Sequence, residues 1–225
     1  MSVRVFAAAT EPGVVTLAPE ESHYLARVRR VRPGAAVEVL DPGGGGWDAE
    51  VEHVDPKRAV VRLLQPLAPR PPFALDLAVG LTDAKAAYDV VARAVEGGAR
   101  SLTFVTTERS QPTRLNAERT ARVIAAARRQ CGRLDPLPIQ EPLALATWLE
   151  QPRVGYVASL QTAAGGITTA QDVWVLLGPE GGLTPTEDQR ARDAGLRALS
   201  LGPFVLRTEV AVTASIAAVG AISGV

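Results

Sequence analysis

The chain has 225 residues, enough for one large domain or two small ones, and 47% of them are apolar, which predicts a packed core and excludes wholesale disorder. The 24 basic residues balance the 24 acidic ones, which excludes a protein that is basic overall but not a local basic patch. The single cysteine cannot form an internal disulfide, and neither end carries a long apolar segment, so we expect a cytoplasmic protein without a membrane anchor.

The first part of the chain, residues 1–66, predicts a small, mostly β domain. Strands are expected where apolar residues alternate, at residues 2–7, 14–17, 36–40, 47–54 and 58–64. Residues 43–46 are four glycines without a following Lys-Ser/Thr, so they indicate a hairpin loop and not a phosphate-binding loop. A helix is expected to begin at Pro19, because acidic residues follow this proline.

Arginines gather after this helix start. They are Arg27, Arg29, Arg30 and Arg32. The cluster predicts either a solvated helix end stabilised by the helix dipole or contacts to an RNA backbone, and both interpretations stay open. The two histidines, His23 and His53, have no cysteine or second histidine nearby, so no metal site is expected.

A proline-rich linker at residues 67–73 precedes a second domain at residues 74–225. Here short apolar runs alternate with helix-like segments. Strands are expected at 75–79, 102–106, 154–159, 173–177 and 198–201, and helices at 84–96, 117–130, 143–149, 186–194 and 209–219. The alternation predicts an α/β fold, a parallel sheet with helices on both faces, whose ligands bind beyond the carboxyl ends of the strands.

Two Gly-Pro loops lie at such strand ends, at residues 177–183 and 201–211. Each follows an apolar run and precedes a helix-like segment, so we expect them to form one composite pocket. Arg207 and Glu209 stand between apolar residues in the second loop, which is more charge than a simple connection needs.

Residues 100–133 hold eight arginines against two glutamates, a local charge of +6. The helix expected at 117–130 has four arginines and one acid, so it has few stabilising ion pairs, and RNA contact is favoured over a solvated face. The candidates for RNA contact in this stretch are Arg109, Arg122, Arg128, Arg129 and Arg133.

Several motifs resemble those of the RsmE family, knotted methyltransferases of the SPOUT class that modify N3 of a uridine in small-subunit ribosomal RNA. The two Gly-Pro loops carry the resemblance. Weaker matches are Ser22-His-Tyr-Leu with Val28-Arg-Arg, Ala94-Val-Glu-Gly-Gly, Glu108-Arg-Ser and Gln130-Cys-Gly-Arg. Phe204 and Val210 depart from the family, which commonly has Arg and Thr there.

The resemblance implies a PUA-like β-barrel that binds RNA, followed by a SPOUT domain with a trefoil knot. It also implies S-adenosylmethionine as cofactor, 16S ribosomal RNA or the assembled small subunit as partner, and a homodimer. The expected cofactor-binding residues are Leu177, Gly178, Glu180, Gly181, Leu201, Gly202, Leu206 and Thr208. Glycines there allow close backbone approach, and leucines supply apolar faces for adenine.

Methyl transfer to uridine N3 requires the nitrogen to be deprotonated or nearly so. Arg207 is the candidate to stabilise the resulting anion. Glu209 or Glu180 could take the proton, or could hold Arg207 and the cofactor; an Arg207–Glu209 ion pair that only braces the loop is the structural alternative. The leaving group is a neutral thioether, so no metal is required. Two other functions stay open: ribose 2′-O methylation, or a non-catalytic role in ribosome assembly.

Overall fold

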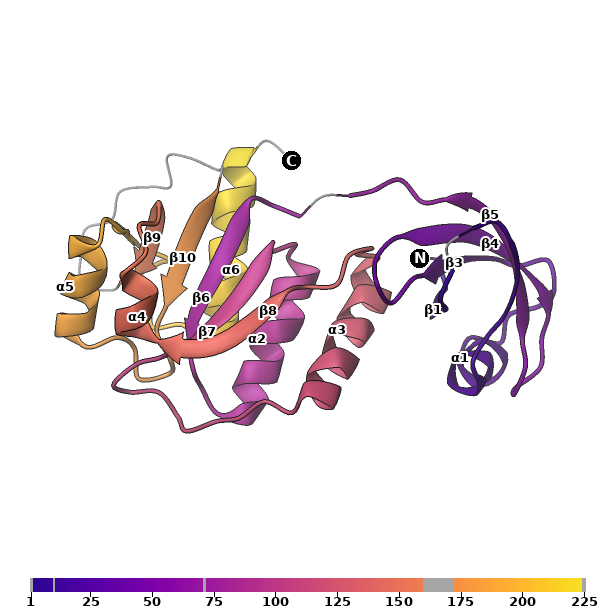
Figure 1. Ribbon diagram of the computed structural model, residues 1–225, viewed down its shortest axis with the longest axis horizontal. Helices are drawn as coiled ribbons and strands as arrows, with labels where there is room; N and C mark the ends of the chain where they lie inside the picture. The colour runs from indigo at the N-terminus through magenta and orange to yellow at the C-terminus, as the bar shows by residue number, and fades with distance from the viewer. Residues whose placement is uncertain (1, 10, 71, 160–171, 224–225) are drawn as a thin grey trace. The chain divides into compact units, whose positions relative to one another are not determined.

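The computed structural model describes residues 2–9, 11–70, 72–159 and 172–223. The chain divides into two compact units (Figure 1). One comprises Met1–Arg70 and Arg128–Pro136, and the other comprises Pro71–Ala127 and Leu137–Val225. The break after Arg70 falls inside the proline-rich segment. The assignment of Arg128–Pro136 to the first unit is a feature that the sequence did not indicate.

The first unit contains a sheet with the strand order β1-β3-β4-β5-β2. Strand β1 (Arg4–Phe6) pairs parallel with β3 (Ala36–Leu40), and the remaining pairs, through β4 (Gly46–His53), β5 (Val60–Pro66) and β2 (Gly13–Thr16), are antiparallel. The strands agree with the predicted ranges to within a few residues.

The core of this unit forms because alternate residues of the strands point to one face of the sheet. Val39, Val51 and Val61 are fully buried. Trp47 is also buried, and its indole Nε1–H donates to the carbonyl of Ala9 at 2.9 Å, so the polar atom of this large side chain is satisfied. This packing gives the N-terminal unit a rigid frame.

The helix predicted at Pro19 is present but changes type. An α-helical turn, α1 (Pro19–His23), continues as a π-helix, η1 (Tyr24–Arg29), and ends at Arg30, whose φ of 51° is left-handed. A π-helix closes i→i+5 hydrogen bonds and is rare, and such turns often occur at functional sites. The hydrophobic pattern could predict a helix here, but not this winding.

The second unit is built on a six-stranded sheet with the order β11-β9-β10-β6-β7-β8, in which every pairing is parallel. The strands are β6 (Leu75–Gly80), β7 (Ser101–Thr106), β8 (Ile139–Ala144), β9 (Gly155–Ala158), β10 (Val173–Leu177) and β11 (Arg197–Leu199). Strand β6 is buried along its whole length, as expected for a central strand covered on both faces.

Helices cover both faces of this sheet, which confirms the predicted α/β architecture (Figure 1). Helices α2 (Ala84–Glu96) and α6 (Thr208–Ser223) pack against each other and against the central strands. Helices α4 (Leu145–Leu149) and α5 (Pro185–Asp193) pack on the other strands of the sheet. No helix in the described part of the chain is long and apolar enough to cross a membrane.

The prediction of a helix at residues 143–149 is wrong at its start. Residues Ile139–Ala144 form β8, and the helix begins only at Leu145. Strand β8 lies at the edge of the sheet and is mostly exposed, so it lacks the continuous apolar run that marks the central strands. The remaining helix, α3 (Ala117–Cys131), begins in the second unit, and its last residues belong to the first.

Candidate functional site

One pocket in the second unit is lined by both Gly-Pro loops. It lies beyond the carboxyl ends of β9, β10 and β11, the edge at which parallel sheets bind ligands. All eight residues expected to contact a cofactor line it. Residues of the pocket that the sequence did not single out for binding are Ala158, Ser159, Pro179, Gly182, Leu183, Leu199, Phe204, Val205 and Ala211.

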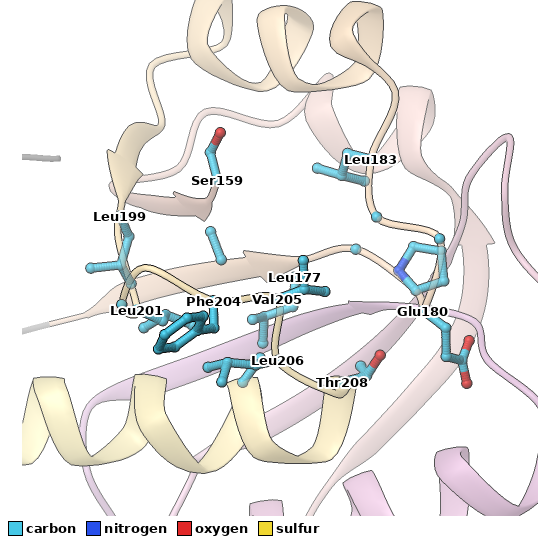
Figure 2. Close-up of a pocket in the computed structure, with 17 residues that line it drawn as sticks. Ser159, Leu177, Glu180, Leu183, Leu199, Leu201, Phe204, Val205, Leu206 and Thr208 are labelled. Carbon is cyan, nitrogen blue, oxygen red and sulfur yellow. The ribbon is translucent and has the colours of Figure 1, made fainter. Parts of the chain in front are cut away.

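The pocket has a volume of about 220 Å³. Small-molecule sites usually enclose roughly 300–1,000 Å³, so a ligand of nucleoside size or larger would extend through the mouth. Ser159 and Leu183 lie across the space from Val205 and Leu206, with Leu177 between them (Figure 2). The walls are therefore largely apolar and suit a flat aromatic ring.

The first loop folds back tightly after β10. The amide of Gly182 donates to the carbonyl of Pro179 at 2.8 Å, closing a turn. A Cβ added to Gly178 would lie 2.7 Å from the backbone nitrogen of Leu183 and 2.8 Å from the carbonyl carbon of Gly182. Only glycine fits at this position without moving the backbone of the loop.

The second loop leaves polar backbone groups available. Gly202 has a φ of 125°, a conformation that favours glycine. Among the residues that the structure describes, Leu201 and Leu206 take part in no hydrogen bond. Because backbone N–H and C=O groups are rarely left unpaired when partly buried, these two residues are suited to bind the polar edge of a ligand.

The two proposed catalytic residues lie beside the pocket and do not line it. Arg207 is exposed and Glu209 is half-buried, and they flank the pocket residue Thr208 at the start of α6. Within the described part of the chain neither side chain has an ion-pair or hydrogen-bond partner. The structure therefore does not contain the Arg207–Glu209 ion pair considered as the structural alternative.

The basic stretch at residues 100–133 does not form one patch. Arg100 is paired with Asp76 and Asp172, which raises the pKa of its guanidinium. Arg109 donates to the carbonyl of Gly181 in the first pocket loop at 2.7 Å. Arg122 is exposed on α3, with Glu118 3.8 Å away.

Arg128 belongs to the interior of the first unit. It is 2% exposed, and its guanidinium donates to the carbonyls of Asp41, Pro42, Arg133 and Leu134. Burial without a contacting carboxylate lowers the pKa of Arg128 from its ordinary value. Because its guanidinium donors bind backbone carbonyls, Arg128 is not available to RNA, and the prediction that it contacts RNA is wrong.

Arg129 and Arg133 also have internal partners. Arg129 pairs with Glu21 at 2.5 Å and stacks 4.4 Å from the centre of the Tyr24 ring. Arg133 is 8% exposed and pairs with Asp135 at 2.6 Å. The Arg129–Glu21 pair ties the end of α3 into the first unit, and the internal pairs of Arg129 and Arg133 remove both residues from the expected RNA surface.

The arginines around the π-helix remain free. Arg27, Arg29 and Arg30 are exposed, and none of their side chains has an ion-pair or hydrogen-bond partner among the described residues. No group of three or more His, Cys, Asp or Glu side chains that could hold a metal ion is found among those residues either. The sequence hardly distinguishes exposed arginines from internal ones, because Arg29-Arg30 and Arg128-Arg129 are both adjacent pairs.

Comparison with known proteins gives the family. A model described as an RNA methyltransferase domain matches residues 69–223, and one described as an RNA methyltransferase PUA domain matches residues 17–64. The ribosomal RNA small subunit methyltransferase E of Synechocystis is 29% identical over 223 residues, which cover 92% of this chain and 73% of the relative. The protein of the same description from Aquifex aeolicus is 26% identical over 205 residues, covering 86% and 87%.

Two solved structures share the fold over nearly the full length. The ribosomal RNA small subunit methyltransferase E of Neisseria gonorrhoeae, bound to S-adenosyl methionine, superposes with a TM-score of 0.83 at 25% identity. A methyltransferase of Legionella pneumophila in complex with the same cofactor gives 0.81 at 25% identity. Each alignment covers 99% of this chain and 98% of the other. Since the first family model spans well over half of the sequence, the chain belongs to the RNA methyltransferase family, with a PUA domain preceding its methyltransferase domain.

Proposed function

We propose that this enzyme transfers a methyl group from S-adenosylmethionine to N3 of a uridine in the 16S ribosomal RNA of the small subunit. The observation that carries the proposal is a pocket lined by both Gly-Pro loops at the carboxyl edge of the parallel sheet. The relatives named as small-subunit methyltransferases supply the RNA class, and the structures with bound cofactor supply the ligand class. A ribosomal substrate agrees with the cytoplasmic location expected from the sequence.

The residues of the pocket fit this cofactor. Glycine at position 178 lets the first loop fold tightly into a wall of the pocket, and the unpaired backbone groups of Leu201 and Leu206 can bind the polar edge of adenine. Leu177, 2% exposed, contributes an apolar wall. Glu180 and Thr208, at one end of the pocket, can hold hydroxyl groups of the ribose (Figure 2). When bound, S-adenosylmethionine supplies an activated methyl group and leaves as a neutral thioether.

Arg207 is assigned the stabilisation of the uracil anion. As N3 loses its proton, negative charge spreads onto the two flanking carbonyl oxygens, and a cation held next to them lowers the barrier. Arg207 is exposed, unpaired within the described chain, and one residue from the pocket lining at the start of α6. The positive end of the α6 helix dipole also lies at this N-terminus, so it too stabilises a nearby anion.

Glu209 is the proposed proton acceptor. It is half-buried in the first turn of α6, two residues from Arg207, and has no cationic partner among the described residues. A carboxylate without an ion-pair partner keeps its lone pairs available for a proton. Glu180, which is exposed on the opposite loop, then serves the cofactor.

We further propose a homodimer and the trefoil knot of the SPOUT class. Large apolar side chains of the second pocket loop and the start of α6 are exposed: Phe204 is 77% exposed, Val205 76% and Val210 45%. The outward residues of α6 continue this surface without a charge, and clustered exposed apolar residues typically mark an interface. Phe204 and Val210 are two of the positions where the chain departs from the family pattern, and both exposed side chains would lie in this interface.

The RNA surface of the first unit is assigned to the π-helix. Arg27 and Arg29 belong to η1, and Arg30 ends it with left-handed backbone. Exposed guanidinium groups bind phosphates in bidentate fashion and release counterions from the RNA. In the second unit, Arg109 and Arg122 are the exposed candidates from the original set.

Replacing Arg27 and Arg29 with glutamine should weaken binding to small-subunit ribosomal RNA and flatten its salt dependence. Each lost phosphate contact reduces the slope of log K against log salt by about 0.7–0.9, so the double variant should lose about 1.5. The slope is measured by fluorescence anisotropy between low and physiological salt. Arg62→Gln, which removes an arginine already paired with Glu52, is the matched control and should leave the slope unchanged. An unchanged slope in the double variant would remove η1 from the RNA footprint.

The proposed reaction is tested by incubating the purified protein with S-adenosylmethionine and unmodified small-subunit ribosomal RNA, either naked or assembled into subunits. Nucleoside mass spectrometry should then detect 3-methyluridine at one position. Formation of a 2′-O-methyl nucleoside would replace the proposed reaction with ribose methylation. Absence of any methylated nucleoside on both substrates, with no heat of cofactor binding, would favour the assembly protein without catalysis.

A further inference from the structure

A tight turn, Thr107–Ser110, follows β7 near the pocket. Its amide and hydroxyl groups close it internally: the amide of Thr107 donates to Oγ of Ser110 at 2.9 Å, and the two hydroxyls lie 3.0 Å apart. The amide of Ser110 donates to the carbonyl of Thr107 at 3.2 Å. The turn therefore holds its two tip residues, Glu108 and Arg109, in a defined place.

Two hydrogen bonds join this tip to the first pocket loop and to α5, the helix that follows it. Nη1 of Arg109 donates to the carbonyl of Gly181 at 2.7 Å, and the amide of Glu108 donates to Oε1 of Glu187 at 2.8 Å. The other carboxylate oxygen of Glu187 accepts from the amide of Thr184 at 2.9 Å and from its hydroxyl at 3.1 Å. The turn thus contacts the loop directly at Gly181, 72 residues away in sequence, and the first turn of α5 at Glu187, 79 residues away.

The aliphatic part of Arg109 also packs on the loop. A Cβ added to Gly181 would lie 3.3 Å from both Cβ and Cδ of Arg109. The φ of Gly181 is not left-handed, so the glycine is explained by this close packing and not by its backbone conformation. Arg109 therefore contacts the cofactor loop through both its stem and its guanidinium group.

We infer that Arg109 is a positioning residue that couples RNA binding to the cofactor loop, an inference that rests on the proposed function. Its side chain is exposed and uses one of the five N–H donors of a guanidinium in the described structure. The remaining donors can bind an RNA phosphate in a bidentate geometry. A phosphate bound there orders the Arg109 side chain, and this in turn orders the loop at Gly181.

Such a link makes the two binding events mutually favourable. If RNA increases the affinity for the cofactor by a given factor, the cofactor increases the affinity for RNA by the same factor. The entropic cost of ordering Arg109 and the loop is then paid once, because the first ligand to bind has already restrained the loop that the second ligand contacts. The consequence is an enzyme that holds its cofactor best when its substrate is present.

The coupling is measured by calorimetric titration of S-adenosylmethionine with and without small-subunit ribosomal RNA. In the wild type, RNA should tighten cofactor binding by about fivefold or more. Arg109→Ala should lose most of this enhancement while its affinity without RNA falls by at most about threefold. Arg190→Ala removes an exposed arginine of α5 that has no assigned role, so this matched control should keep the enhancement.

A second variant tests whether the position of the Arg109 side chain, and not only its charge, is required for the coupling. Gly181→Ala retains the Arg109 cation but pushes its stem off the loop, so it should reduce the enhancement without changing the salt dependence of RNA binding. The inference is overturned if Arg109→Ala keeps the full enhancement, if it weakens cofactor binding equally with and without RNA, or if the wild type shows no enhancement. If the wild type binds no cofactor under either condition, the proposed function fails instead.

Discussion

Arg207→Ala should fold normally, bind S-adenosylmethionine and lose methyl transfer, with kcat reduced about 100- to 1,000-fold. Removal of one preorganised donor from an anion-stabilising site has costs of this order, because the charge develops in the transition state and not in the bound ground state. The affinity for the cofactor should change little, since the side chain does not line the pocket. Single-turnover rates on ribosomal RNA, read by mass spectrometry, measure the effect.

The interpretation of Arg207→Ala depends on Arg207→Lys as a companion. Lysine keeps the positive charge but is a point charge without the planar fork, so partial recovery of kcat is expected. A kcat near the wild-type value in the alanine variant would show that Arg207 is not catalytic. If the alanine variant instead raises KM for RNA with kcat unchanged, Arg207 contributes to binding alone.

Gly178→Ala should reduce the affinity for S-adenosylmethionine by about 100-fold or more. The new Cβ would meet three backbone atoms of Gly182 and Leu183 at 2.7–2.9 Å, and backbone cannot move aside as a flexible side chain can. The loop must therefore shift, and the pocket loses the wall that it forms. Isothermal titration calorimetry measures the change, and circular dichroism reports whether the fold survives.

Gly181→Ala is the matched control for this loss of cofactor affinity. It adds the same methyl group to the same loop, but its nearest neighbours are atoms of the Arg109 side chain at 3.3 Å, which can give way. Without RNA, its affinity for the cofactor should stay within a few-fold of the wild type. An equal loss of cofactor affinity in the two variants would mean that the loop tolerates no added methyl group at either position. The backbone contact at Gly178 would then not explain the loss.

The parts of the fold that could be predicted are those set by local chemistry. Helix α2 has its predicted bounds because Asp83 caps it, accepting from the amides of Lys85 and Ala86, and because glycines follow Glu96. The two Gly-Pro loops reveal the pocket because each follows a strand of the parallel sheet at its carboxyl end. The pocket residues that were missed, such as Ser159, depend on which strand ends lie side by side, and one chain's local pattern does not carry that information.

The charges were the least predictable feature. A run of arginines indicates RNA contact only if the side chains reach solvent, and Arg128 shows how this fails: its partners are backbone carbonyls, which every residue has and no sequence pattern marks. The contact between Arg109 and Gly181 was hidden for a similar reason, since a carbonyl acceptor 72 residues away leaves no local signal. Burial and long-range pairing, and not residue type, decide what each arginine does.

The assignment of Arg128–Pro136 to the first unit has a consequence for the order in which the protein is made. Domains commonly fold as they leave the ribosome, from the N-terminus onward. Here Arg128 binds the carbonyls of Asp41 and Pro42, and Arg129 pairs with the carboxylate of Glu21. These two arginines are synthesised only after β6, α2 and β7, so the contacts form late in translation. The N-terminal unit thus begins to be translated first, but it is completed only after part of the second unit has been made.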